Sequence, residues 1–182
     1  MDTEAESGGR AVTDDSLLRG AFAMRAAAYA HVFDVLREEF GEERAMELSK
    51  RAIRRMGEAM APRFADFAPK DLAGLAQAFL GSIPRRESMF APEVLRADAE
   101  CLEIQFHRCP LKEAWIAAGR SEADLARLCE IAGAIDSGLF TAAGFSFAGT
   151  TWQPGESGCC RLRVAPGPAG SDRTSGAFSD FV

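Results

Sequence analysis

The residue types in this sequence best suited to chemistry are its cysteines and histidines. The cysteines are Cys101, Cys109, Cys129, Cys159 and Cys160, and the histidines are His31 and His107. The cysteine count is odd, and the first residues lack the basic start and apolar stretch of a secretory signal, so we expect five free thiols in the cytoplasm. Because no Cys-x-x-Cys pair occurs, we expect neither a metal site nor a bound cofactor.

His107 and Cys109 form the first pair whose spacing suits catalysis. Apolar and polar residues alternate just before them, which predicts a strand with one buried face. On a strand that continues through residue 109, the two side chains point to the same face, roughly 7 Å apart, and contact one small ligand. In the alternative interpretation, His107 faces solvent on the polar side of the sheet and Cys109 is a small buried side chain.

Cys129 and Asp136 form the second pair. They are seven residues apart on a predicted helix and therefore share a face. A thiol at this position can act as a nucleophile if a neighbouring base or cation lowers its pKa. The apolar neighbours Leu125 and Leu128 favour inert core packing as the alternative. Cys160, on the apolar face of a predicted hairpin, is expected to line the same cavity as a substrate-binding residue.

Together these groups predict one active site. We expect a single pocket bordered by two thiols, one imidazole and one carboxylate, namely Cys109, Cys129, His107 and Asp136. One of the two thiols would attack the substrate, with His107 as its base, because this is the only imidazole in the second half of the chain. A water activated by a carboxylate, with Asp136 or Glu103 as base, is the alternative route.

Substrate-binding side chains are expected beside this pocket. A guanidinium matches a carboxylate with two parallel hydrogen bonds, and Arg108 is the candidate for that role. Thr150 ends a predicted strand next to a glycine-rich turn, where a hydroxyl can orient a polar substrate. Arg161 and Arg163 are expected to form surface salt bridges with Glu103 of a neighbouring strand instead.

The first half of the chain predicts helices. A capping residue at 14–16 begins the first helix, and Gly41 is suited to end it. Apolar residues at helical spacing continue in a second helix, which Pro62 ends or kinks. A third helix is expected over residues 70–80.

The second half predicts an antiparallel sheet and one more helix. Strands are expected at 101–108, 145–152 and 159–165, with residues 94–97 as the hairpin partner of the first. Ser121 starts a capping box at the beginning of the additional helix. We therefore expect an α+β fold, in which N-terminal helices pack with a later helix on a small antiparallel sheet.

Length and charge limit the number of domains and the partners. The 182 residues, 47% of them hydrophobic, suit one domain at 14–165, between a flexible N-terminus at 1–13 and a flexible tail at 166–182. A net charge of −6 gives no attraction to nucleic acid. The longest mostly apolar stretch, residues 21–33, is shorter than the roughly 20 residues of a membrane span. We therefore expect a small-molecule substrate and neither a nucleic-acid nor a membrane partner.

Two parts of the sequence resemble one known family. The stretch RAAAYAHVFDVLREEFGEERAMELSKRAIRRMGE at 25–58 resembles the N-terminal signature of the L-2-amino-thiazoline-4-carboxylic acid hydrolase family, a long helix that ends in an FGEE-like step. The later stretches are CPLKEAW from Cys109, LC at 128–129, and GFSFAGTTWQPGESGCCRLRV at 144–164. They resemble the CP step, the cysteine-bearing helix and the Gly- and Phe-rich hairpin of the same family. The order and spacing of these pieces carry the resemblance.

The resemblance implies hydrolytic opening of a cyclic amidine ring. In that family the ring of a 2-amino-thiazoline carboxylate opens to carbamoyl-cysteine, on the way to L-cysteine. Family members often carry an acidic residue a few positions after the helix cysteine. This sequence departs from that pattern, because it has Ala132 and Gly133 three and four positions after Cys129. A non-catalytic small-molecule-binding module is therefore the alternative. A third hypothesis is that the protein is an interaction subunit whose first helices, rich in Ala and Met, form a homo-oligomer.

Overall fold

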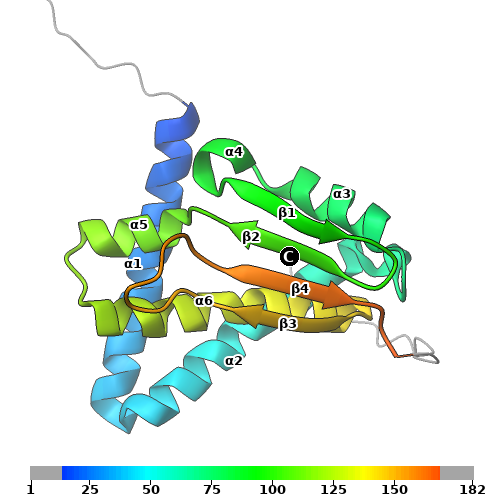
Figure 1. The fold of residues 1–182 in the computed structure, drawn as a ribbon. Helices are drawn as coiled ribbons and strands as arrows, with labels where there is room; N and C mark the ends of the chain where they lie inside the picture. The colour runs from blue at the N-terminus through cyan, green and yellow to red at the C-terminus, as the bar shows by residue number, and fades with distance from the viewer. Residues whose placement is uncertain (1–13, 169–182) are drawn as a thin grey trace, which may run out of the picture.

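The computed structural model describes residues 14–168, and the segments 1–13 and 169–182 lie outside the described residues. Within the described part, helices come first and a four-stranded antiparallel sheet is completed by the last strands (Figure 1). The predicted α+β class is confirmed. The first residues of the expected flexible tail, 166–168, are described, and the backbone N–H of Gly167 donates to the carbonyl of Pro69 at 2.8 Å.

Two long helices begin the described chain, as predicted. They are α1 (Asp14–Phe40) and α2 (Glu42–Met60), and Gly41 separates them. Gly41 has φ of +78°, a left-handed conformation that side chains disfavour, so glycine is suited to this reversal. The predicted effect of Pro62 is confirmed, because α2 ends just before the short 3-10 helix η1 (Ala61–Arg63).

Short helices connect α2 to the sheet. They are η2 (Ala65–Phe67), α3 (Leu72–Ser82) and the single turn α4 (Arg86–Met89). The helix α3 begins two residues later than predicted, because the Asp71 side chain caps it by accepting a hydrogen bond from the Gly74 backbone N–H at 2.9 Å.

The sheet contains β1 (Pro92–Ala97), β2 (Leu102–Phe106), β3 (Ser146–Thr150) and β4 (Arg161–Ala165) in the spatial order β1-β2-β4-β3. All neighbouring pairs are antiparallel, so both predicted hairpins are confirmed. The strand β4 lies beside β2, with Ile104 opposite Leu162. This pairing places the buried residues of both hairpins on the same face.

β2, β3 and β4 are shorter than the sequence pattern predicts, whereas β1 begins two residues earlier than predicted. β2 ends at Phe106, and the chain then turns into α5 (Pro110–Ala117), with Cys109 in the cap position. The expectation that His107 and Cys109 lie on one strand face is therefore wrong. Likewise, Cys159 precedes β4 and does not belong to it, although its backbone N–H still donates to the carbonyl of Phe106 at 2.9 Å.

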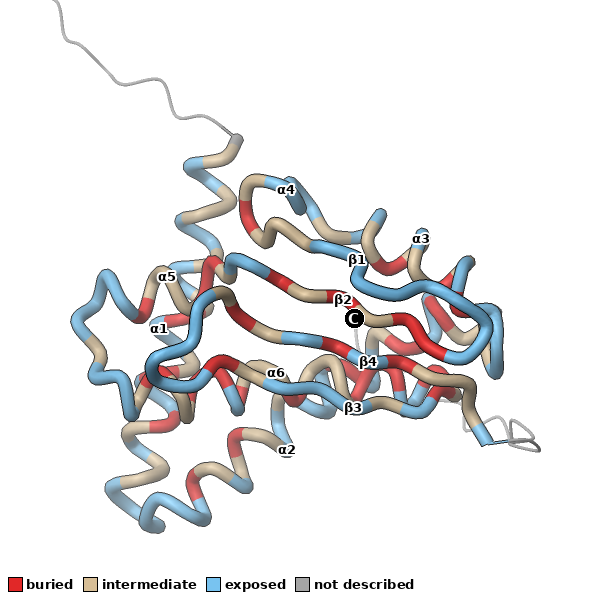
Figure 2. Tube along the Cα trace, viewed as in Figure 1, coloured by how far each residue is buried: buried red, intermediate tan, exposed pale blue. Residues whose placement is uncertain are grey.

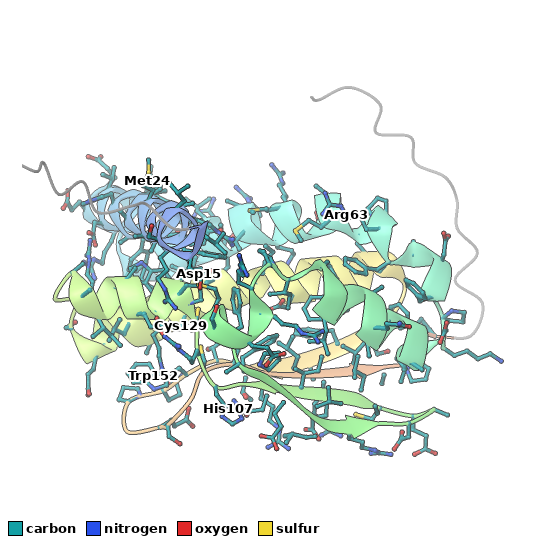
Figure 3. The ribbon with its side chains drawn as sticks, turned by 90° about the horizontal axis from the view of Figure 1, so that it is seen from above. Asp15, Met24, Arg63, His107, Cys129 and Trp152 are labelled. Atoms are coloured by element: carbon teal, nitrogen blue, oxygen red, sulfur yellow. The ribbon has the colours of Figure 1, made fainter. Side chains whose placement is uncertain are left out.

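The long helix α6 (Glu122–Ala143) crosses the centre of the molecule. Ser121 caps it as predicted, and its hydroxyl accepts a hydrogen bond from the Asp124 backbone N–H at 3.2 Å. Figure 1 and Figure 3 show α6 between the sheet on one side and α1 with α2 on the other. Gly57 of α2 and Gly138 of α6 allow close contact, because a Cβ on either would overlap the backbone of the opposite helix.

The buried residues, coloured red along the backbone in Figure 2, form two hydrophobic clusters. One lies between the sheet, α3 and the C-terminal end of α6, and it includes Phe79 and Phe140. The other lies between α1, α5 and the N-terminal end of α6, and it includes Phe33 and Trp115. Cys109 packs against both clusters. Within residues 14–168, no helix has the length and apolar character needed to cross a membrane.

Candidate active site

Asp136 differs from the other half-buried acidic side chains. The others that the structure describes all form ion pairs, and they are Asp15, Asp34, Glu103, Glu113 and Asp124. Asp136 forms no ion pair and no side-chain hydrogen bond with any described residue. Since half-buried carboxylates are normally paired, an unpaired one is a candidate functional group.

The position of Asp136 on α6 follows from its neighbours on the same face. One turn before it, Gly133 lies against the end of β3, since a Cβ there would come within 2.6 Å of Thr151 Cγ2. One turn after it, the Phe140 ring stacks on the Phe147 ring, with centroids 5.5 Å apart. Asp136 therefore lies one turn from each of these two contacts, on the same side of α6 as Gly133 and Phe140.

Protein surrounds the carboxyl of Asp136 closely enough to change its ionisation. Desolvation raises the pKa of Asp136 to about 7, and the charge of Arg25 on α1 opposes this rise. The group is therefore close to half-ionised at neutral pH. A carboxyl in this state can take up or release a proton during a reaction.

Two half-buried cations that act electrostatically on Asp136 or Cys129 have no acidic partner among the described residues. The Arg25 Nε donates to Tyr29 Oη at 3.0 Å and forms no ion pair with any described residue. Lys112 of α5 donates to the carbonyl of Gly158, and its Nζ lies 5.0 Å from the centre of the Trp152 ring. Its charge lowers the pKa of Cys129, so it lies within electrostatic range of that thiol.

Four thiols gather where α5, α6 and the loop before β4 meet. All five cysteines of the chain are free. Cys109 is hydrogen-bonded to Cys159, whose Sγ lies 3.6 Å from that of Cys160. Cys129 on α6 is close enough to interact electrostatically with Cys109 and Cys159. The prediction that Cys109, Cys129 and Cys160 approach one another is supported by these contacts.

A strand over the predicted range 159–165 leads to the expectation that Cys159 and Cys160 point to opposite faces, which the structure does not support. That expectation assumed a strand through both residues, but β4 begins only at Arg161. In the loop before β4, the two Sγ atoms turn toward each other. Adjacent side chains alternate between faces only where the backbone is a regular strand.

Three of these thiols, Cys109, Cys129 and Cys159, are protonated at neutral pH. The hydrogen bond with Cys159, followed by burial, raises the pKa of Cys109 well above its usual range. Burial, followed by the neighbouring thiols, raises the pKa of Cys129 to about 12. For Cys159, the bond with Cys109 lowers the pKa, but the bond with Cys160 and burial raise it, giving about 12. A neutral thiol is a weak nucleophile.

The predicted imidazole base lies elsewhere. His107 Nε2 lies 2.8 Å from Glu93 Oε2. Both side chains are exposed. Figure 3 shows His107 on the side of the sheet away from α6, whereas Cys129 lies on the α6 side. The structure therefore does not bring His107 together with the thiols and Asp136.

The predicted carboxylate-binding residue, Arg108, is exposed and already paired. Its guanidinium donates twice to Glu113, at 2.8 and 3.2 Å. Thr150 is exposed at the end of β3. The predicted surface pairs are confirmed, because Arg161 and Arg163 both form ion pairs with Glu103. Of the two carboxylates considered as bases, Glu103 is therefore engaged in ion pairs, whereas Asp136 has no ion pair with a described residue.

Sequence reasoning did not identify Arg25 and Lys112. For Arg25 the only local signal is its spacing of four from Tyr29 in an alanine-rich helix. Lys112 follows the Cys109–Pro110 step within one helical turn. Within the described range, no group of three or more His, Cys, Asp or Glu side chains is arranged to hold a metal ion.

A comparison with known protein families gives a match over most of the chain. The sequence model of the L-2-amino-thiazoline-4-carboxylic acid hydrolase family matches residues 21–164. This range spans α1 to β4 and includes every residue of the site described above. A search of curated proteins gives no match.

Proposed function

This chain belongs to the L-2-amino-thiazoline-4-carboxylic acid hydrolase family, and from that premise we propose that it hydrolyses a cyclic amidine that carries a carboxylate. The substrate that the family name indicates is L-2-amino-thiazoline-4-carboxylate. Its expected product is carbamoyl-cysteine. The family match supports the reaction class, and the unpaired Asp136 supports a site for it.

The proposed reaction adds one water across the ring. The water oxygen bonds to the amidine carbon, and one ring bond from that carbon to sulfur or nitrogen breaks. The water proton that the base removes is returned to the departing ring atom, so atoms and charge balance. The site must therefore supply a base for water, an acid for the leaving atom and a group that binds the carboxylate.

Asp136 is the proposed base and acid. Its pKa of about 7 gives both protonation states at neutral pH, as a group that first accepts and then donates a proton requires. Glu103, the other carboxylate considered, is held by Arg161 and Arg163 at the exposed sheet surface. The observation that carries the proposal is that Asp136 is half-buried, unpaired and raised in pKa.

Attack by a thiol is the second candidate route. It is favoured by the thiol cluster and by Lys112, whose charge lowers the pKa of Cys129 and Cys159. It is opposed by burial, which keeps these thiols neutral, and by the distant His107. In the proposed water route, Cys109 and Cys129 line the site without reacting.

The proposed function is tested with purified protein and L-2-amino-thiazoline-4-carboxylate. Mass spectrometry follows the loss of substrate and the appearance of carbamoyl-cysteine. Catalytic turnover is the expected result. Saturable binding without product would favour the non-catalytic binding module, and absence of both binding and product would contradict the proposal.

A further inference from the structure

Arg25 differs from almost every other half-buried cation in the described range. Five such side chains form ion pairs, and these are Arg19, Arg37, Lys50, Arg120 and Arg127. Only Arg25 and Lys112 have no acidic partner among the described residues. A half-buried guanidinium without an ion pair keeps donors available for an anion.

The contacts of Arg25 fix its side chain and leave its terminal nitrogens free. The Nε donates to Tyr29 Oη at 3.0 Å, and the guanidinium carbon lies 5.1 Å from the centre of the Tyr29 ring. Tyr29 Oη in turn contacts Met56 Sδ of α2 at 3.7 Å. Neither terminal nitrogen of Arg25 donates to a described residue. These two nitrogens can donate in parallel to one carboxylate.

The other cations nearby are less suited to that role. The ammonium of Lys112 already donates to the carbonyl of Gly158 and lies over Trp152. The guanidinium of Arg108 is occupied by both oxygens of Glu113. Among the described residues, Arg25 is also the one cation whose charge acts on Asp136. An anion held by Arg25 would therefore lie close to the proposed base.

We infer that Arg25 binds the carboxylate of the substrate and makes the site specific for anionic cyclic amidines. This inference rests on the proposed function for the identity of the ring, but carboxylate binding by Arg25 can be measured without turnover. Arg25 is assigned to binding and specificity. It is not assigned to proton transfer.

The test measures binding by calorimetry with two probes that have no amidine to hydrolyse. They are L-thiazolidine-4-carboxylate and its 4-carboxamide, which differ in the charge that Arg25 would recognise. The wild-type protein is expected to bind the carboxylate at least about tenfold more tightly than the amide. Arg25→Met is expected to weaken carboxylate binding by about 10- to 100-fold and to leave amide binding unchanged.

Two further variants separate this role from a structural one. Arg25→Lys keeps the charge but loses the planar pair of donors, so its affinity should fall between wild type and Arg25→Met. Arg55→Met removes one positive charge from the exposed surface of α2 and should bind both probes as wild type does. Circular dichroism and the unfolding temperature establish whether each variant is folded. If Arg25→Met does not fold, the comparison is made with Arg25→Lys alone.

The outcomes for the inference are distinct from those for the proposed reaction. If wild type binds both probes equally, binds neither, or keeps its carboxylate affinity without Arg25, the inference is overturned. If Arg25-dependent binding is observed but L-2-amino-thiazoline-4-carboxylate is not hydrolysed, only the proposed reaction fails. With turnover, Arg25→Met should raise KM by about 10- to 100-fold and change kcat much less.

Discussion

Arg25 of α1 lies close enough to Asp136 of α6 to lower its pKa, yet the two side chains form no ion pair. A direct ion pair would hold the carboxyl ionised well below neutral pH. Their separation leaves the pKa of Asp136 at about 7 and leaves the guanidinium available to an anion. This arrangement underlies the predictions that follow.

The first prediction concerns the pH dependence of hydrolysis. If Asp136 must be ionised to activate water, kcat/KM should rise about tenfold per pH unit below pH 7 and level off above it. Arg25→Met should move the rise to higher pH, because the charge of Arg25 lowers the pKa of Asp136. A rate that does not change between pH 5 and pH 9 would contradict the assignment.

The second prediction concerns stability. Folding raises the pKa of Asp136, so ionising this carboxyl destabilises the folded state. This destabilisation is absent below about pH 4, grows between about pH 4 and pH 7, and is complete above about pH 7. Asp136→Asn should therefore raise the free energy of unfolding by on the order of 1–3 kcal/mol at pH 8, a discounted figure because the side chain is only half-buried. Urea unfolding at pH 4 and pH 8 measures the difference. An equal effect at both values would refute the prediction.

The third prediction concerns the contact between α2 and α6. A Cβ on Gly138 would overlap the backbone of Arg54, which cannot move aside without separating the helices. Gly138→Ala should cost about 3 kcal/mol of unfolding free energy. Gly20→Ala is the matched control, because nothing lies within 4 Å of its Cβ position in α1, and it should stabilise by about 0.5–1 kcal/mol. Similar unfolding temperatures for the two variants would be inconsistent with this packing.

The fourth prediction separates the two routes of attack. In the water route, Cys109→Ser and Cys129→Ser should each keep turnover within about tenfold of wild type, since these thiols do not react. A loss of several orders of magnitude in either folded variant would favour thiol attack instead. Trapping of a covalent adduct on either cysteine, detected by mass spectrometry, would give the same answer independently.

Much of the fold could be predicted because its signals are local. Gly41, Pro62 and Ser121 mark helix boundaries through their own backbone preferences, and the structure places the boundaries there. The antiparallel hairpins follow from alternation of apolar residues and from turns. The strand ends were less predictable, because the turn at Cys109 depends on how α5 packs against α1, where Trp115 Nε1 donates to the carbonyl of Ala26.

The site could be predicted only in part. The spacing of Cys129 and Asp136 places both on one helix face, and the thiols do gather near it. The direction of His107 was not predictable, because it depends on the end of β2 and on Glu93 of the neighbouring strand. Arg25 comes near Asp136 only through the packing of α1 against the later helices, and no local pattern records such a contact.

The most direct test of the account compares two carboxylate variants on L-2-amino-thiazoline-4-carboxylate at pH 8. Asp136→Asn removes the proposed base, whereas Glu103→Gln removes a carboxylate that is engaged in surface ion pairs. If Asp136 is the base, Asp136→Asn should lower kcat by about 10²- to 10⁴-fold, while Glu103→Gln should stay within about threefold of wild type. Full activity in a folded Asp136→Asn protein would contradict the account.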